Sequence, residues 1–130
     1  MILDTSFLID LMHKDKAALD KAFELESRNE DTYLTTVSVF ELFTGIARSP
    51  NPKAEKEKVM NSLKNHRILP LDQESASIAG EIHGQMLKKG TPIGVQDSLI
   101  AGIAKRKYER VLTRNTKDFK KIHGLLIETY

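Results

Sequence analysis

Four acidic residues lie where an apolar segment gives way to a predicted helix or turn. They are Asp4, Glu41, Asp97 and Asp118, in the segments MILDTS, SVFEL, IGVQDSLIA and TRNTKDF. Each acid alone is explained more simply as a helix-capping group, because a carboxylate at a helix N-terminus gains about 0.3–1 kcal/mol from free N–H groups and the helix dipole. Glu41 fits that explanation best, since Ser38 three residues before it completes the pattern of a capping box. Helix capping does not require the four side chains to lie close together. If they share one cleft, a catalytic or metal-binding role is indicated.

The chemistry expected of such a cleft is that of a divalent metal ion. Carboxylates that share a cleft raise one another's pKa values unless a cation lies between them. The chain has no Cys, its four His residues form no helical pair, and oxygen ligands at this density select Mg²⁺ or Mn²⁺ over zinc. Such ions, bound to carboxylates, activate water and stabilise a phosphoryl transition state.

Small polar residues flank the first and the last of these acids. Thr5 and Ser6 directly follow the first acid, and Thr113 and Asn115 precede the last one. Hydroxyl and amide groups at such positions can hydrogen-bond a ligating carboxylate or a metal-bound water and so fix its orientation. We expect these four residues to support the acids.

Positive charge is concentrated toward the end of the chain. Residues 88 to 121 include ten Lys or Arg and three acids, whereas the rest of the chain has ten basic and fifteen acidic residues. Such clustering is typical of a surface for a polyanion, and an ordinary solvated face explains it about as well. If the polyanion is RNA, binding should weaken steeply with added salt. The residues expected to contact the RNA backbone are Lys105, Arg106, Lys107, Arg114 and Lys117.

Short strands alternate with helices along the chain. Strand-like segments occur at residues 1–4, 32–36, 67–71, 110–113 and 125–129. Helical patterns occur at residues 5–11, 16–28 and 38–48, from Pro52 past Leu63, at 72–89 and 93–107, and as a short turn at 115–122. Five strands joined by helical crossovers predict an α/β fold with a parallel sheet and helices on both faces. Ligands bind such sheets at the carboxyl edge, where the strand order reverses, so at least three of the four acids should face that edge.

The chain has the size and composition of one soluble globular domain, with 130 residues of which 40% are hydrophobic and 29% charged. No apolar run approaches the ~20 residues that cross a bilayer, so no membrane association is expected. The absence of Cys fits a cytoplasmic protein. We therefore expect a single cytoplasmic domain.

The segments LDTS, SVFEL, IGVQDSLIA and TRNTKDF, in this order and at these intervals, resemble those of the PIN-domain family, and most of all its small VapC-type toxins. The resemblance spans essentially the whole chain. It implies a single PIN-like nuclease domain over residues 1–130, built as a Rossmann-like three-layer α/β/α sandwich with about five parallel strands. It also implies an Mg²⁺- or Mn²⁺-dependent endoribonuclease. The four acids named above match its catalytic positions. The resemblance implies that Asp4 and Asp97 are the best candidate ligands of one or two ions, which position water for attack on a phosphodiester. Glu41 and Asp118 would assist them, directly or through water, and Thr113 and Asn115 match polar positions beside the last acid.

The same resemblance implies partners. RNA is the expected substrate, and the toxin is expected to form a homodimer. A small antitoxin protein is the expected binding partner. A peptide of that antitoxin would cover the acidic cleft and place a basic side chain against the carboxylates.

The sequence leaves alternatives open. The motifs do not distinguish an RNA nuclease from a DNA nuclease of the same fold. A catalytically inactive PIN-like module that binds RNA or protein would keep the acids as caps. An aspartyl-phosphate phosphatase would carry a second Asp two residues after its nucleophile, and Ser6 occupies that position here. Binding of Mn²⁺ would separate the metal-dependent enzyme from the inactive module.

Overall fold

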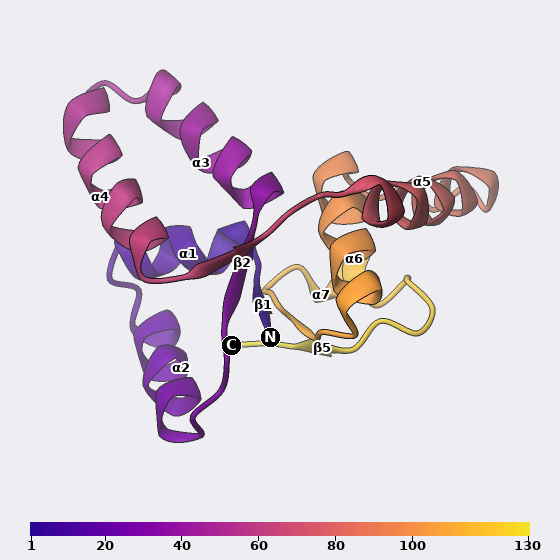
Figure 1. Cartoon of the computed structure of the whole chain (residues 1–130), viewed down its shortest axis with the longest axis horizontal. Coiled ribbons are helices and arrows are strands. Elements are labelled where there is room, and N and C mark those ends of the chain that lie inside the picture. The colour runs from indigo at the N-terminus through magenta and orange to yellow at the C-terminus, as the bar shows by residue number, and fades with distance from the viewer.

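A five-stranded sheet, parallel throughout, runs through the centre of the protein, and the computed structural model describes all 130 residues (Figure 1). The strands are β1 (Ile2–Leu3), β2 (Tyr33–Thr35), β3 (Arg67–Leu69), β4 (Val111–Leu112) and β5 (Ile127–Glu128). Their order in the sheet is β3-β2-β1-β4-β5. The predicted parallel sheet is confirmed, although each strand is shorter than its sequence pattern indicated.

The strand order reverses between β1 and β4. The chain builds β1, β2 and β3 in one direction and then crosses back to add β4 and β5 on the other side of β1. Leu3 lies beside Leu112 in this pair of strands, and the next residue, Asp4, donates its backbone N–H to the Leu112 carbonyl at 3.0 Å. The residues that follow the two strands, Asp4 and Thr113, therefore leave the sheet close together at the reversal point, where ligands bind in open α/β sheets.

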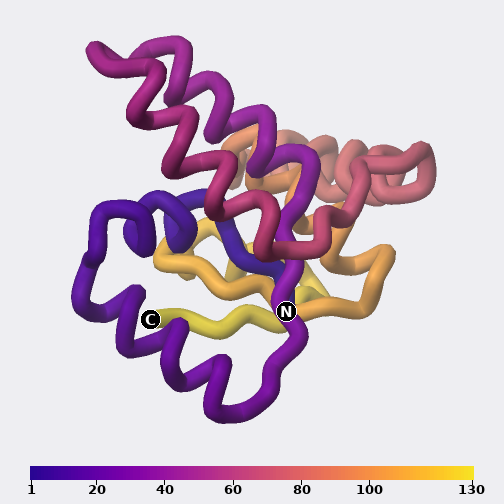
Figure 2. The backbone as a smooth tube through the Cα atoms, turned by 60° about the vertical axis from the view of Figure 1, so that its left-hand side comes forward, coloured from indigo at the N-terminus to yellow at the C-terminus, as the bar shows by residue number.

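Seven helices connect the strands. They are α1 (Thr5–Met12), α2 (Lys16–Ser27), α3 (Thr36–Arg48), α4 (Pro52–Lys64), α5 (Gln73–Lys88), α6 (Val95–Lys107) and α7 (Thr116–Phe119). Helices α3 and α4 pack side by side as a hairpin that projects beyond the sheet, and α5 packs against α6 on the other side of the molecule (Figures 1 and 2). Every helix that the sequence predicted is present. None of them is long and apolar enough to cross a membrane.

The sheet separates two hydrophobic cores. Because successive side chains of a strand point to opposite faces, Ile2 and Val111 pack with residues of α5, α6 and α7. Leu3 and Leu112 pack instead with residues of α1, α2, α3 and α4. All four side chains are at most 2% exposed, and burial of this kind stabilises by roughly 1.5–3 kcal/mol for each large aliphatic side chain. The two cores give the predicted three-layer α/β/α sandwich.

Helix α3 begins earlier than predicted. Its N-cap is Thr35, whose Oγ1 accepts a hydrogen bond from the Ser38 N–H at 3.1 Å. The predicted capping box of Ser38 and Glu41 is therefore wrong, because the last residue of β2 is itself a capping hydroxyl residue and no loop separates the strand from the helix. Glu41 lies in the second turn, and α3 has no acid in its first turn. Helix capping therefore does not account for Glu41.

Candidate active site

Asp4 is a buried carboxylate held by three donors. It is the N-cap of α1 and only 5% exposed. Its Oδ1 accepts a hydrogen bond from the Thr5 N–H at 2.9 Å. Its Oδ2 accepts hydrogen bonds from Thr113 Oγ1 at 2.7 Å and from Ser6 Oγ at 3.1 Å. Residues that follow β1 and β4 thus fix the orientation of this side chain, as their positions in the sequence predict.

Glu41 approaches the same place from α3. Thr5 Oγ1 donates a hydrogen bond to Glu41 Oε1 at 2.7 Å. Since a hydroxyl has one proton, Ser38 Oγ is then the donor in its 2.8 Å hydrogen bond with Thr5 Oγ1. Burial raises the pKa of Glu41, and the negative charge of Asp4 raises it further. The hydrogen bond from Thr5 lowers this pKa but does not cancel the rise. These hydroxyl groups tie the second turn of α3 to the start of α1.

Asn115 connects the other two acids. Its side-chain Nδ2 donates hydrogen bonds to Asp97 Oδ2 at 2.8 Å and to Asp118 Oδ2 at 3.1 Å. Its backbone N–H donates to Thr113 Oγ1 at 2.9 Å, and that hydroxyl in turn donates to Asp4. The polar segment after β4 therefore links three of the four acids.

The electrostatics of Asp97 show that the four acids share one environment. Asp97 lies in the first turn of α6, as predicted. The pKa of its carboxyl is raised to about 6, and burial is the largest cause. The negative charges of the other three acids add to this rise, and the hydrogen bond from Asn115 opposes it. The structure thus gathers the four predicted acids, Asp4, Glu41, Asp97 and Asp118, at one edge of the sheet.

Asp118 differs from the other acids because it has a basic partner. Lys121 Nζ lies 3.3 Å from its Oδ1. The hydrogen bond from Asn115 and the contact with Lys121 hold the pKa of Asp118 below its usual range. The remaining three acids of the cluster take part in no ion pair. Their negative charge is left uncompensated by the protein.

The donor set suits a hard divalent cation. It consists of carboxylate, hydroxyl and amide groups without sulfur, which is the chemistry that Mg²⁺ and Mn²⁺ prefer. No three acidic or His side chains are already arranged around a common point where an ion would sit. Asn115 Nδ2 instead stands between Asp97 and Asp118. The cluster therefore offers the charge and the oxygen atoms for an ion, without a preformed coordination shell.

Three of the predicted RNA-contacting residues do not line this cluster. Lys105, Arg106 and Lys107 form the last turn of α6, roughly 12–15 Å along the helix from Asp97. Arg106 is paired with Glu74 at 2.6 Å. The first turn of α6, with Asp97, lies at the edge of the sheet that holds the acids, and its last turn lies at the opposite edge. These three basic residues are therefore near Asp97 in sequence but not in space.

Arg114 and Lys117 do lie at the edge that holds the acids. Lys117 belongs to α7, beside Asp118 in sequence, and its charge contributes to the lowered pKa of that acid. Arg114 is paired with Asp10 at 3.1 Å and with Asp15 at 2.7 Å. The charge of Arg114 is therefore compensated within the protein.

Two residues that contact an acid or a hydrogen-bond partner of an acid are not among those predicted. Ser38 is fully buried and contacts Thr5, although its place in the sequence suggested a helix cap. Lys121 pairs with Asp118. The spacing of three residues between Asp118 and Lys121 is a signal for contact within a helical turn, whereas nothing in the sequence near Ser38 points to Thr5.

Comparisons with known proteins agree with this architecture. The chain matches the model of the PIN domain over residues 1–125. It is 27% identical over 129 residues to the tRNA(fMet)-specific endonuclease VapC of Salmonella typhimurium, with 99% of this chain and 96% of that protein covered. It is 33% identical over 132 residues to the ribonuclease VapC of Rickettsia bellii, with 99% and 95% covered.

A solved structure shows the same fold. The crystal structure of DNA-bound VapBC from Salmonella typhimurium matches with a TM-score of 0.87 at 27% identity, and the match covers 98% of this chain and 96% of that chain. The family match and the relatives extend over nearly the whole sequence. The chain belongs to the PIN-domain family, within which these curated relatives are VapC proteins.

Proposed function

We propose that this protein is an Mg²⁺- or Mn²⁺-dependent endoribonuclease and the toxin of a toxin–antitoxin pair. The metal-dependent part rests on one observation, the gathering of four carboxylates in which Asp97 is affected by the charges of the other three. The relatives named as a VapC endonuclease and a VapC ribonuclease support phosphodiester cleavage in RNA. The VapBC complex supports an antitoxin partner.

Each residue of the cluster has a role in this proposal. Asp4 and Asp97 would hold the ion, with Glu41 and Asp118 beside them. When bound, a divalent ion supplies an activated water and neutralises charge on the phosphodiester under attack. The Asp97 carboxyl, with a pKa of about 6, must release its proton before it can serve as a ligand. Asp4 is already oriented by its three donors.

Cleavage of a labelled RNA tests the proposal. The wild type should cut the RNA only when Mg²⁺ or Mn²⁺ is added, and Asp4→Asn and Asp97→Asn should each lose at least roughly 100-fold in rate, the upper end of the loss seen when an outer-shell partner of a metal is removed. Asp72→Asn is the matched control, because Asp72 is the N-cap of α5 as Asp4 is of α1. Asn caps a helix as well as Asp does. If Asp4 were only a cap, the two variants would behave alike.

The same assay separates the alternatives. A DNA strand of the same sequence should stay intact, and cleavage of DNA in preference to RNA would favour a DNA nuclease of this fold. The inactive module would bind no Mn²⁺, so the melting temperature of the wild type would be unchanged by the ion. Cleavage by Asp4→Asn at the wild-type rate would contradict the metal-ligand assignment.

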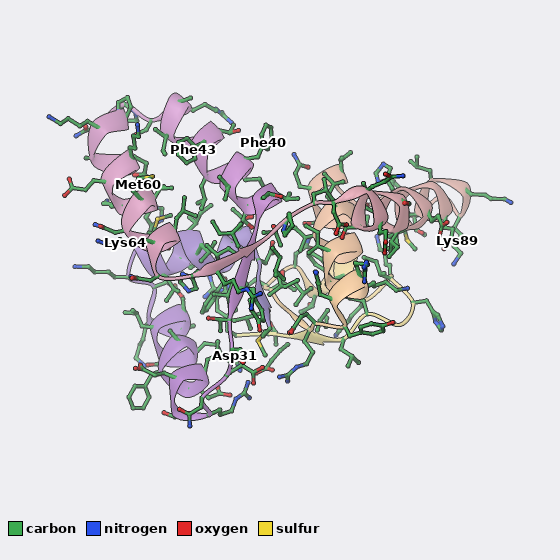
Figure 3. The ribbon with its side chains drawn as sticks, viewed as in Figure 1. Asp31, Phe40, Phe43, Met60, Lys64 and Lys89 are labelled. Carbon is green, nitrogen blue, oxygen red and sulfur yellow. The ribbon has the colours of Figure 1, made fainter.

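An apolar groove next to the cluster supports a protein partner. Its volume is about 320 Å³, and its walls are formed by Thr36, Val37, Phe40, Leu71, Val95, Gln96 and Leu99. Phe40 is 64% and Val95 56% exposed, and contiguous exposed apolar surface of this kind marks interaction sites. The lining residues Phe40 and Gln96 directly precede Glu41 and Asp97 in sequence. Figure 3 shows Phe40 and Phe43 on α3, with Met60 on the neighbouring α4.

We place a segment of the antitoxin in this groove. The apolar residues of that segment would cover Phe40 and Val95, and a basic side chain would reach the uncompensated carboxylates. Phe40→Ser should then weaken co-purification with the co-expressed antitoxin and leave Mn²⁺ binding unchanged. Equal recovery of antitoxin with wild type and variant would contradict this placement. The homodimer remains a prediction. Light scattering tests it by measuring the molar mass of the isolated protein.

A further inference from the structure

We propose that Arg114 is a positioning residue whose guanidinium fastens the segment after β4 to the helices that follow β1. That segment orients three of the four acids. The inference rests on the proposed metal-dependent nuclease, and it gives Arg114 a role other than the RNA contact that the sequence suggested.

Arg114 stands between two residues that hold the acids. On one side, Thr113 is fully buried and donates its hydroxyl to Asp4 at 2.7 Å. On the other side, the Asn115 amide donates to two further acids of the cluster at 2.8 and 3.1 Å. A shift of the backbone at Arg114 would therefore move the support of Asp4 and that of the other two acids together.

Two carboxylates and an aromatic ring hold the guanidinium. Its Nη1 lies 3.1 Å from Asp10 Oδ2, and its Nη2 donates to Asp15 Oδ2 at 2.7 Å. Its central carbon lies 4.5 Å from the centroid of the Tyr130 ring. The Tyr130 hydroxyl donates to the same Asp10 oxygen at 2.6 Å. We call these four residues, Arg114, Asp10, Asp15 and Tyr130, the arginine clamp. Contacts with two carboxylates and with an aromatic ring fix an arginine more rigidly than a single ion pair does.

The clamp is anchored in rigid parts of the fold. Asp10 lies in α1, the helix that Asp4 caps, and Asp15 is the N-cap of α2. The Tyr130 ring packs edge-on against Phe7, with ring centroids 4.7 Å apart and an interplanar angle of 74°. Phe7 is 1% exposed within the core.

The segment after β4 therefore touches α1 at two places, at Asp4 through Thr113 and at Asp10 through Arg114. Two points of attachment fix both the distance and the angle between α1 and the segment. One point would leave the angle free. The clamp thereby sets where Asn115 holds its acids relative to Asp4.

Another arginine of this chain provides a matched control. Arg110 also bridges two carboxylates, those of Glu30 and Glu128, at 2.8 and 3.1 Å. Its side chain is 40% exposed, against 42% for Arg114. Arg110 precedes β4, so it lies at the opposite end of that strand from the acids. The two arginines match in exposure and in having two carboxylate partners. They differ in their position relative to the acid cluster and in the Tyr130 ring that Arg114 contacts.

The test compares Arg114→Gln, Arg114→Lys and Arg110→Gln with the wild type. The measurements are the melting temperature in EDTA, the affinity for Mn²⁺ by calorimetry, kcat and KM for RNA cleavage, and the NMR signals of the Asn115 side-chain amide in the metal-free protein. Arg114→Gln should bind Mn²⁺ roughly tenfold more weakly and lose a similar factor in kcat, as expected when an outer partner of a metal site is removed. KM should change little. The Asn115 amide signals should shift. Arg114→Lys keeps the positive charge but not the planar guanidinium, so it should recover part of the lost Mn²⁺ affinity and kcat.

Arg110→Gln should lower the melting temperature about as much as Arg114→Gln does, while its Mn²⁺ affinity and Asn115 signals stay those of the wild type. Equal losses of Mn²⁺ affinity in the two glutamine variants would overturn the inference. A rise in KM with kcat unchanged in Arg114→Gln would overturn it too and would indicate contact with RNA. If the wild type binds no Mn²⁺, the proposed function fails. The positioning role is then decided by the Asn115 signals alone, and unchanged signals in Arg114→Gln would overturn it.

Discussion

Asp97 is the residue at which the stability of the fold and the proposed activity make opposite demands, because the ionised carboxylate that would bind the metal ion also disfavours folding. Its pKa of about 6 in the folded protein lies above its ordinary value of 3.8. The folded state therefore binds the proton more tightly than the unfolded chain does. The contribution of this group to stability is fully present below pH 3.8 and is lost as the pH rises through about 6. The metal-free protein at neutral pH thus keeps a carboxylate that disfavours folding.

We predict that Asp97→Asn stabilises the metal-free protein near neutral pH. The neutral amide is not repelled by the other acids, so the free energy of unfolding should rise by roughly 1–2 kcal/mol after allowance for solvent screening. The gain should disappear below pH 3.8, where the wild-type carboxyl is protonated. Denaturant unfolding in EDTA across this pH range measures it. Glu55→Gln, which alters a first-turn acid of α4 outside the cluster, should show no such gain. A less stable Asp97→Asn near neutral pH would contradict the electrostatic account.

Thr113 offers a second test among single residues. Its hydroxyl donates to Asp4 and accepts from the Asn115 N–H. Thr113→Val keeps the shape but removes one of the three donors to the buried Asp4 and leaves the Asn115 N–H without its acceptor, so it should lower the free energy of unfolding by about 1–3 kcal/mol. It should also weaken Mn²⁺ binding by roughly 10–100-fold. Thr113→Ser keeps the hydroxyl, so it should have nearly the free energy of unfolding and the Mn²⁺ affinity of the wild type. Wild-type Mn²⁺ affinity in Thr113→Val would show that this hydroxyl does not support the site.

The sequence predicts single residues well where they adjoin the end of a strand. Asp4, Glu41 and Asp118 are found this way, because parallel strands bring their carboxyl ends to one edge. Asp97 follows a helix rather than a strand, and only the motif resemblance assigns it to the same site. Residues defined by contact between distant segments are not found. Ser38 contacts Thr5 across 33 positions of sequence, and Arg114 contacts Asp15 across 99. No local pattern encodes such pairs.

Among the helices, α6 positions Asp97, and its own position is set by close packing on α5. A Cβ at Gly102 of α6 would lie 2.5 Å from the Ser75 carbonyl oxygen and 2.6 Å from Ala79 Cβ. Contacts this short force one helix away from the other. Glycine is therefore required at this position for the observed distance between the helices.

Gly102→Ala should accordingly destabilise the protein, by about 1–3 kcal/mol, the usual range for overpacking a core. It should also weaken Mn²⁺ binding, because the displaced helix carries Asp97. Gly84→Ala in α5 is the control, since nothing lies within 4 Å of a Cβ there. That variant should instead gain about 0.5–1 kcal/mol from the better helix propensity of alanine. Denaturant unfolding measures both. A Gly102→Ala protein as stable as the wild type would show that the helices can separate freely.

The order and type of the helices and strands follow from periodicity and from Pro and Gly breakers, and the structure confirms them. The start of α3 does not follow, because the strand residue Thr35 caps the helix and removes the loop that the pattern suggested. Clustering of positive charge along the sequence predicts that Lys105 contacts RNA, but Lys105 lies in the last turn of α6. A helix that precedes a parallel strand turns its last residues toward the amino end of that strand, away from the acids.

On the scale of the whole molecule, the basic residues divide between the two edges of the sheet. Lys117 and Lys121 lie beside the acid cluster, whereas Lys107 ends α6 at the other edge. RNA held at the acids can therefore contact Lys117 more readily than Lys107. The sequence shows that basic residues are concentrated in one part of the chain, but it does not show at which edge of the sheet each of them lies.

Salt dependence of RNA binding tests the division. Measured with the inactive Asp4→Asn protein, affinity should fall with added salt, and Lys117→Gln should reduce the slope of log affinity against log salt by about 0.7, the value for one phosphate contact in a single strand. Lys107→Gln should leave the slope unchanged. A larger effect from Lys107→Gln than from Lys117→Gln would place the RNA on the other edge.

The most direct test of the account is to locate a metal ion in the protein. Crystals soaked in Mn²⁺ should show anomalous scattering from a manganese ion bound by Asp4 and Asp97, and crystals of Asp97→Asn treated in the same way should lack it. The account is contradicted if wild-type crystals that contain Mn²⁺ show none within reach of these two carboxylates.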